Sequence, residues 1–216
     1  MKLEYFGLHG RAQMIRMALH HCKVEFEDAH LSFPDFGAKK ASYEYGQLPV
    51  LHLDDGTTLS QSMAILRWVG RNHKGKNGEA LYPGGDDADL TYEIDSVCDS
   101  LADQTSLFVC FLFEQVPGYK EKDEHFTQWI VKHFPKFLAG LEERLSKGTR
   151  YLCSDNLTIA DIAVGSLFFR LVYNDSYENC HIMQAVVNKY PKVVAWMEIM
   201  KNDFEETLKN GLQSAR

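Results

Sequence analysis

The residue pair Gln61-Ser62 lies where a short strand pattern gives way to a helical one. Met63 to Val69 follow it with the apolar spacing of a helix. The first backbone N–H groups of a helix lack intrahelical partners, and the helix dipole adds positive potential at that end. An amide and a hydroxyl at this position therefore predict a binding site for a small anion such as a carboxylate or a phosphate.

The elements around this pair predict a small α/β domain. Leu48-Pro49 opens the alternating strand Val50 to Leu53, and Asp54-Asp55-Gly56 turns the chain into Thr57 to Ser60 as a hairpin. Nearer the N-terminus, the patterns predict a strand, a helix and a second strand over residues 2–6, 12–21 and 24–31. The order strand, helix, strand, helix, hairpin, helix is typical of helices that cover a sheet.

Residues 75–87 are rich in glycine and charge and have no periodicity, which is typical of a linker. They divide the chain into residues 1–74 and residues 88–216. Beyond the linker, apolar residues recur at helical spacing from Leu90 to Leu112, from Phe126 to Leu145 and after Pro191. We therefore expect an all-helical second domain.

One further helix carries a start signal of its own. Thr158 and Asp161 have the spacing of a capping box, and Leu157 and Ile162 have that of a hydrophobic staple. The helix that follows, to Val172, is apolar nearly all round, which predicts that it is buried.

Three ordered motifs carry a resemblance to a known family. Tyr5 to Arg16, Gly46 to Val50 and Leu59 to Ile65 resemble the glutathione-site motifs of cytosolic glutathione S-transferases, with the greatest similarity to the sigma class. The likeness extends over essentially the whole chain. It implies a thioredoxin-like α/β domain that binds glutathione, followed by an all-α C-terminal domain.

The resemblance assigns glutathione-binding roles to individual residues. It implies that Gln61 and Ser62 hold the γ-glutamyl carboxylate, and that the backbone of Leu48, before a cis Pro49, pairs with the cysteinyl backbone as an added strand does. The other glutathione contacts that it implies are Tyr5, Arg11, Phe36, Lys40, Gln47 and Asp103.

The chain departs from the family pattern at two positions. Phe36 stands where sigma enzymes often have a tryptophan, and a phenyl ring has no N–H to donate. His9 stands where the family commonly has an arginine. Lys39-Lys40 also fits an ordinary solvated helix face, so the role of Lys40 rests on the resemblance alone.

Tyr5 and Arg11 carry the expected catalysis. A free thiol has a pKa of about 8.5, so little of it is thiolate at neutral pH. The resemblance implies that the Tyr5 hydroxyl donates to the sulfur, and such a bond contributes about 1.5 to 3 kcal/mol, or about one to two pKa units. Arg11 and the first helix N-terminus add positive potential. Without the resemblance, Tyr5 could be an aromatic residue with a purely structural role in the strand.

The second substrate and the assembly also follow from the resemblance. A small hydrophobic electrophile is expected in a pocket bounded by Leu8, Thr105, Cys110 and the region around Phe204, although apolar residues at this spacing commonly form core. A homodimer is expected, in which Asp103 contacts the γ-glutamyl ammonium bound by the partner subunit. Asp95, Asp99 and Asp103 equally fit a solvated acidic stripe.

Composition excludes several other classes. A net charge of -7 argues against nucleic acid and anionic membrane as partners, and no apolar run is long enough to span a bilayer. Five scattered cysteines without a C-x-x-C pair, and no evident signal sequence, predict a reducing cytoplasmic location. His20-His21-Cys22 has no second cluster to complete a metal site. No cofactor is expected beyond glutathione as co-substrate.

The expected function is conjugation of glutathione to small hydrophobic electrophiles in detoxification. One alternative is glutathione-dependent isomerisation of prostaglandin H2, known in sigma enzymes, but the vertebrate prostaglandin D synthases align a tryptophan with Cys110. Another is a non-catalytic crystallin or interaction module of the same fold. The presence of Tyr5, Arg11, Gln61 and Ser62 favours catalysis.

Overall fold

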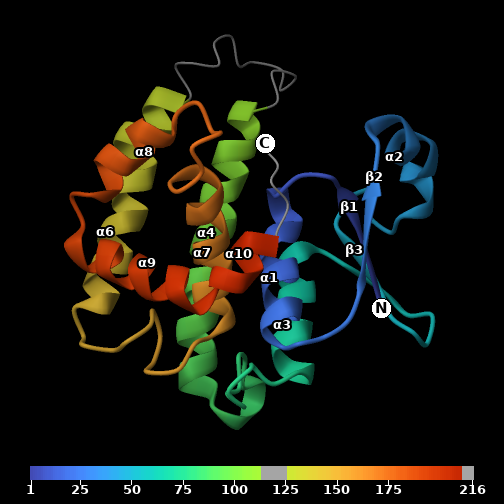
Figure 1. The fold of residues 1–216 in the computed structure, drawn as a ribbon, viewed down its shortest axis with the longest axis horizontal. Coiled ribbons are helices and arrows are strands. Elements are labelled where there is room, and N and C mark those ends of the chain that lie inside the picture. The colour runs from blue at the N-terminus through green and yellow to red at the C-terminus, as the bar shows by residue number, and fades with distance from the viewer. Residues whose placement is uncertain (113–125, 211–216) are drawn as a thin grey trace.

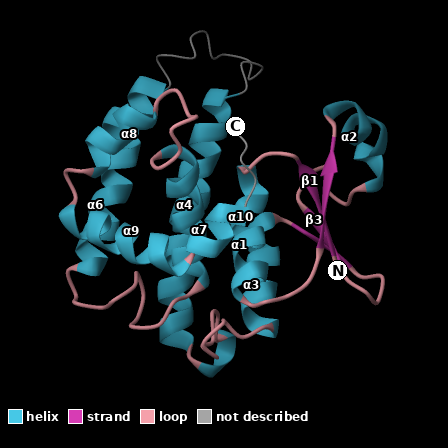
Figure 2. Ribbon diagram, viewed as in Figure 1, coloured by secondary structure: helices cyan, strands magenta, loops and turns pink. Residues whose placement is uncertain are grey.

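The computed structural model describes residues 1–112 and 126–210, and its first half is built on a mixed four-stranded sheet (Figures 1 and 2). The strands are β1 (Lys2–Phe6), β2 (Glu27–Leu31), β3 (Val50–His52) and β4 (Thr58–Ser60). Their order is β2-β1-β3-β4, with β1 parallel to β2 and antiparallel to β3, and β3 antiparallel to β4. The predicted hairpin before Gln61 is confirmed.

Helices flank this sheet on both faces. They are α1 (Gln13–His21), α2 (Phe33–Lys39) and α3 (Ser62–Asn72), with short 3-10 turns at Gly10–Ala12 (η1) and Lys40–Ser42 (η2). Leu3 and Tyr5 of β1 point into the core formed with α1 and α3. Phe6 points the other way, where its ring stacks on Phe33 of α2 at 4.5 Å. The alternation along β1 thus separates a buried face from one covered by α2.

Strand β2 is shorter than the sequence predicted, because it begins at Glu27 instead of Val24. After α1 ends, Lys23 adopts a left-handed φ of 54°, and the Val24 N–H donates to the carbonyl of Leu19. These residues cap the C-terminus of α1, so they do not pair with a strand of the sheet.

The second half is all-helical, as predicted. Its helices are α4 (Ala88–Leu112), α6 (Phe134–Leu145), α7 (Ile159–Leu171), α8 (Cys180–Val187), α9 (Pro191–Asp203) and α10 (Glu205–Asn210), and a 3-10 turn at Gly84–Asp86 (η3) precedes α4. In Figure 1, α7 runs through the middle of this half, where it packs on α4 and α9 and, across to the first half, on α1 and α3. None of the described helices is long and apolar enough to cross a membrane.

The capping box at the start of α7 is confirmed. The Asp161 carboxylate accepts hydrogen bonds from the backbone N–H groups of Thr158 at 3.0 Å and Leu152 at 2.9 Å, and from Trp196 Nε1 at 3.0 Å. Leu157 and Ile162 are both buried. Asp161 therefore fixes the start of α7 to α9 and to the preceding loop.

A continuous helix from Phe126 to Leu145 was predicted, and the structure differs. Trp129–His133 form a turn of π-helix (η4) before α6 begins. Pro135 lacks the N–H that would donate to the carbonyl of Val131 in an unbroken α-helix, which accounts for a change of hydrogen-bond pattern here. Helices α8 and α10 were not predicted.

The two halves are in close contact next to the linker. A Cβ atom on Gly70 of α3 would lie 2.6 Å from the Ile159 side chain of α7, so these helices approach to a distance that only glycine permits. The Ile159 N–H donates to the carbonyl of Leu81 at 2.9 Å, and His21 Nε2 lies 2.6 Å from the Glu79 carboxylate. These contacts hold the first helices of the sheet half against α7.

Candidate functional site

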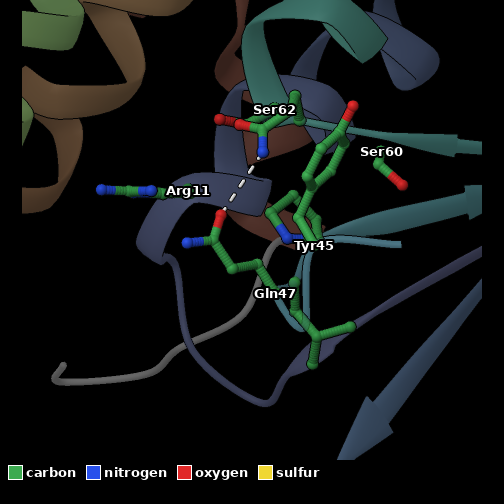
Figure 3. Close-up of a pocket in the computed structure, with 8 residues that line it drawn as sticks. Arg11, Tyr45, Gln47, Ser60 and Ser62 are labelled. Carbon is green, nitrogen blue, oxygen red and sulfur yellow. Dashed lines mark hydrogen bonds between the residues drawn. The ribbon is translucent and has the colours of Figure 1, made fainter. Parts of the chain in front are cut away.

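A small pocket lies where the first turn after β1, the cis-proline turn and the start of α3 meet (Figure 3). Its lining residues are Arg11, Tyr45, Gln47, Leu48, Pro49, Ser60, Gln61 and Ser62. The Leu48–Pro49 peptide bond is cis, as predicted. The structure thus brings together residues that the sequence spreads over three separate motifs.

The N-terminus of α3 forms one wall of this pocket. Ser62 is the first residue of the helix, and Gln61 precedes it with φ 70°, a backbone conformation that costs a residue with a side chain of order 1–3 kcal/mol. The Gln61 side chain donates to Gln47 Oε1 at 3.4 Å across the pocket (Figure 3). The strained backbone therefore aims an amide at the same space as the free N–H groups of the helix.

The charge of the pocket lining is positive. Arg11 is the charged side chain among the lining residues, and no carboxylate lines the pocket with it. In Figure 3 its side chain extends to the left, on the side of the group away from Ser60. A cation beside a helix N-terminus suits a ligand that carries carboxylate groups.

Tyr5 lies near the end of β1 and is not itself among the residues that line this pocket. Its side chain is 7% exposed, and its hydroxyl oxygen accepts a hydrogen bond from the Arg11 backbone N–H at 3.1 Å. Gly10, with φ 40°, passes so close that a Cβ atom there would lie 2.3 Å from the Tyr5 hydroxyl oxygen. The backbone thus holds the oxygen, while the hydroxyl proton remains available to donate to another group.

Arg16 supports the Tyr5 ring from behind. Its guanidinium carbon lies 5.8 Å from the ring centroid, and the group is itself held by Asp28 at 2.9 Å and by the Leu8 carbonyl at 2.8 Å. Arg16 is buried, so this ion pair is shielded from water. The ring position is thereby fixed on more than one side.

The protein's own thiols are poor nucleophiles in the part of the chain that the structure describes. Burial raises the pKa of Cys22 to about 11 and the pKa values of Cys98 and Cys153 to about 12. Cys180 is buried, and its thiol donates to the carbonyl of Val172. None of these four thiols is therefore suited to supply a thiolate at this site.

Two other residues assigned to glutathione, Lys40 and Phe36, do not line the pocket. Lys40 runs along Gly46, where an added Cβ atom would be 3.5 Å from its side chain, and so it lies next to Gln47. Phe36 packs at 5.5 Å on the ring of Phe6 and at 6.0 Å on that of Tyr43, and it is not among the lining residues.

The residues expected around the electrophile do not all come together. Thr105 lies on α4, where its hydroxyl donates to the Leu101 carbonyl, and Leu8 lies beside Gly10 at the Tyr5 ring. Phe204 is instead 1% exposed, with its ring 5.3 Å from that of His21 in the core between the two halves. The side chain of Cys110 lies outside the described residues.

Asp103 is exposed on α4 and is not among the residues that line the pocket. The contact that the resemblance implies for Asp103 is with glutathione bound by a second copy of the chain. Its neighbours in the acidic stripe have a different role, because Arg67 binds Asp95 at 2.7 Å and Asp99 at 2.8 Å.

Tyr45 and Ser60 line the pocket but were missed from the sequence. Ser60 ends β4 directly before Gln61, so its adjacency to the anion-binding pair was the signal that pointed to it. Tyr45 is an exposed aromatic residue in the turn before Gly46, and a turn residue of this kind has no periodicity that marks it. Within the described ranges, no His, Cys, Asp and Glu cluster is arranged to hold a metal ion.

Comparison with known proteins identifies the family. Sequence models of the glutathione S-transferase N-terminal and C-terminal domains match residues 1–71 and 101–198. Glutathione S-transferase 1 of Ascaris suum is 33% identical over 167 residues, 76% of each chain. Glutathione S-transferase 3 of Caenorhabditis elegans is 29% identical over 206 residues, 91% of this chain and 94% of the relative.

Solved structures share the fold. The structure of rat hPGDS complexed with a quinoline has a TM-score of 0.82 at 24% identity, and that of the glutathione S-transferase from Ascaris lumbricoides has 0.75 at 23%. Each comparison covers 100% of this chain and 98% of the other. The thioredoxin-like α/β domain followed by a helical domain, expected from the sequence, is confirmed. The chain belongs to the glutathione S-transferase family and is an enzyme of it.

Proposed function

We propose that this enzyme conjugates glutathione to small hydrophobic electrophiles and that Tyr5 activates the thiol. The observation that carries the proposal is the hydrogen bond of 3.1 Å that the Tyr5 hydroxyl accepts from the N–H of Arg11, a residue that lines the pocket. A hydroxyl that accepts from the backbone keeps its own proton to donate to sulfur.

Glutathione lies in the pocket as an extended peptide. Its γ-glutamyl carboxylate binds at the α3 N-terminus, to Gln61 and Ser62, and its cysteinyl backbone pairs with Leu48. Its glycyl end lies toward Gln47 and Lys40. This arrangement directs the cysteinyl sulfur toward the end of β1, where Tyr5 and the Arg11 charge meet.

The reaction then proceeds through the thiolate. The thiol proton is released to solvent, and the thiolate is stabilised by the Tyr5 O–H donor and by the positive potential of Arg11. The sulfur forms a bond to the electrophilic carbon. The leaving group departs with the electron pair of its bond, or, in an addition, the electron pair moves to a carbonyl oxygen that is then protonated.

We place the enzyme in the sigma class, as a cytoplasmic homodimer that acts in detoxification. The class rests on the motifs around Tyr5, Gln47 and Gln61. The dimer is supported by α4, which carries the exposed Tyr92 (69%), Leu107 (42%) and Asp103 on its surface. Residues 1–74 serve as the glutathione domain, 75–87 as the linker and 88–216 as the helical domain. Sedimentation should give twice the 24.7 kDa chain mass.

Two assays test this function directly. The protein should be retained on immobilised glutathione, and it should conjugate glutathione to an aryl halide faster than the uncatalysed reaction. Absence of both would contradict the proposal. Human hematopoietic prostaglandin D synthase is 25% identical over 202 residues. Prostaglandin H2 is therefore a necessary second substrate to assay, and isomerisation without conjugation would favour the synthase function instead.

A further inference from the structure

Arg170 is a largely buried cation without a carboxylate partner in the described part of the chain. It lies near the end of α7, a helix that is otherwise almost entirely apolar. Its guanidinium carbon lies 5.5 Å from the ring centroid of Phe108 on α4, and no described residue forms an ion pair or a hydrogen bond with it. By contrast, the buried Arg16 is paired with Asp28 at 2.9 Å. Burial lowers the pKa of Arg170, since no nearby anion offsets its desolvation.

The groups that act electrostatically on Arg170 are two tyrosine hydroxyls. One belongs to Tyr5 and the other to Tyr177, in the loop after α7. The Tyr177 hydroxyl is buried and makes no hydrogen bond within 3.5 Å among the described residues, although the Asn179 side chain lies near it. Native proteins rarely leave buried donors unsatisfied, because each costs about 1–3 kcal/mol. An unpaired guanidinium and an unpaired hydroxyl at one place together indicate a missing acceptor.

This pair belongs to the half of the molecule that does not line the glutathione pocket. The residues that line the glutathione pocket all come from the sheet half, between Arg11 and Ser62, whereas Arg170 and Tyr177 belong to the helical half. Phe108, which Arg170 covers, lies about one helical turn after Thr105 on α4. Helices α4 and α7 pack together, and α7 also packs on α1 (Figure 1). Arg170 is within electrostatic range of Tyr5, so a subsite at Arg170 would lie next to the sulfur that Tyr5 is proposed to activate.

We propose that Arg170 and Tyr177 form a carboxylate-binding subsite for the electrophile, so that the enzyme prefers electrophiles that carry a carboxylate group. The proposal rests on the transferase function proposed above. A guanidinium presents a planar fork of N–H donors that matches a carboxylate, and a buried pair of this kind is stronger than an exposed one. The Tyr177 hydroxyl adds a donor to the second oxygen. Neither group has to leave a protein partner when the substrate binds.

A matched pair of electrophiles tests this subsite. 4-Chloro-3,5-dinitrobenzoate and its methyl ester react with thiolate at the same aryl carbon and differ in one negative charge. We expect the wild-type enzyme to have the higher kcat/KM for the carboxylate, after each is divided by its uncatalysed rate. Arg170→Met should lower kcat/KM for the carboxylate by about 10- to 100-fold and change that for the ester by much less.

Two further variants separate the charge from the packing role. Arg170→Lys keeps the charge and should retain part of the preference. Tyr177→Phe keeps the ring and should reduce the preference by about 10-fold or more, the contribution of one hydrogen bond to a charged group. Arg150→Gln is the control, because it removes a positive charge from an exposed position on the helical half. It should leave the ratio between the two substrates unchanged.

Binding of the reaction products gives a readout that does not depend on turnover. The glutathione conjugates of the benzoate and of the ester can be compared by calorimetry in the wild type and in Arg170→Met. Weaker binding of the carboxylate conjugate alone supports the subsite. Equal losses for both conjugates, or an unchanged ratio in every variant, would overturn it. Loss of conjugation with an intact binding difference would instead count against the proposed function alone.

Discussion

The hydroxyl oxygen of Tyr5 accepts a hydrogen bond of 3.1 Å from the backbone N–H of Arg11. This bond joins the end of β1 to the turn that leads into α1, so the residue proposed to activate the sulfur and the start of the positively polarised helix are fixed relative to each other. The side chain of Arg11 meanwhile reaches the pocket that contains Gln61 and Ser62. In the mechanism proposed above, thiol activation and peptide binding are thus coupled through one residue.

Gly10 should be essential for the position of Tyr5. Gly10→Ala places a Cβ atom 2.3 Å from the Tyr5 hydroxyl oxygen and forces a φ of 40° on a residue with a side chain. We expect kcat with an aryl halide to fall by about ten-fold or more, because a small displacement of a catalytic group has a large effect on rate. Steady-state kinetics measure this directly.

The matched control for that substitution is Gly140→Ala in α6, where an added Cβ atom meets open space. It should stabilise the protein by about 0.5–1 kcal/mol, since alanine is the better helix former. Wild-type activity in Gly10→Ala would show that Tyr5 is not held by this contact.

Gln61 should determine the affinity for glutathione. Gln61→Ala removes the amide that lies across the pocket from Gln47, and a hydrogen bond to a charged group contributes about 1.5 to 3 kcal/mol. The Kd for glutathione should rise by about 10- to 150-fold in calorimetry. The increase in Tm with added glutathione should shrink accordingly. Gln128→Ala, at an exposed position in the helical half, is the control, and equal Kd values in both variants would remove Gln61 from the site.

Asp103 should contribute to glutathione binding across a dimer interface. Asp103→Asn removes the charge that we propose faces the γ-glutamyl ammonium of the other subunit, and so it should raise KM for glutathione while kcat stays nearly unchanged. Asp89→Asn changes an exposed carboxylate in the first turn of the same helix and serves as control. A fully active monomer, or an unchanged KM in Asp103→Asn, would return Asp103 to the solvated acidic stripe.

Glu4 should make stability depend on pH in the acid range. Burial disfavours its charged form, but hydrogen bonds with His52, Lys2 and Tyr43 outweigh this effect and hold its pKa at about 2, against an ordinary 4.5. Because the folded pKa is the lower one, the contribution of Glu4 is complete above pH 4.5 and is lost as the pH falls toward 2.

Urea unfolding of wild type and of Glu4→Gln at a series of pH values checks this prediction. The difference in the free energy of unfolding should be constant above pH 4.5 and should shrink between pH 4.5 and 2. A difference that does not vary with pH would show that Glu4 has an ordinary pKa in the folded protein.

The sequence predicted the elements whose signals are local. The turn at Gly56, the cis proline at Pro49 and the capping box at Asp161 each depend on a few neighbouring residues, and all three are confirmed. The start of β2 was misplaced because the left-handed turn at Lys23 depends on how α1 ends. The π-helix before Pro135 was missed because hydrophobic spacing does not distinguish it from an α-helix.

Contacts between distant segments could not be predicted. The sequence alone does not show why residue 10 must be glycine, because the reason is its contact with the Tyr5 side chain in the folded structure. Arg170 had a signal, a charged residue in a helix expected to be buried nearly all round, but its neighbours Phe108 and Tyr177 become evident only when α4, α7 and the loop after α7 are packed together. Side-chain environment depends on tertiary packing, which periodicity does not specify.

The most direct test of the account is the acidity of the glutathione thiol when it is bound. The thiolate absorbs in the ultraviolet, so a pH titration of the bound complex by difference spectroscopy gives its apparent pKa. We expect a value about one to two units below the free thiol value of about 8.5 in the wild type. In Tyr5→Phe it should return close to 8.5. Conjugation should then fall by about 10- to 150-fold, while the Kd for glutathione changes little. Tyr43→Phe, which removes a hydroxyl bound to Glu4 instead, should keep the wild-type value. The same thiol pKa in wild type and Tyr5→Phe would contradict activation by Tyr5.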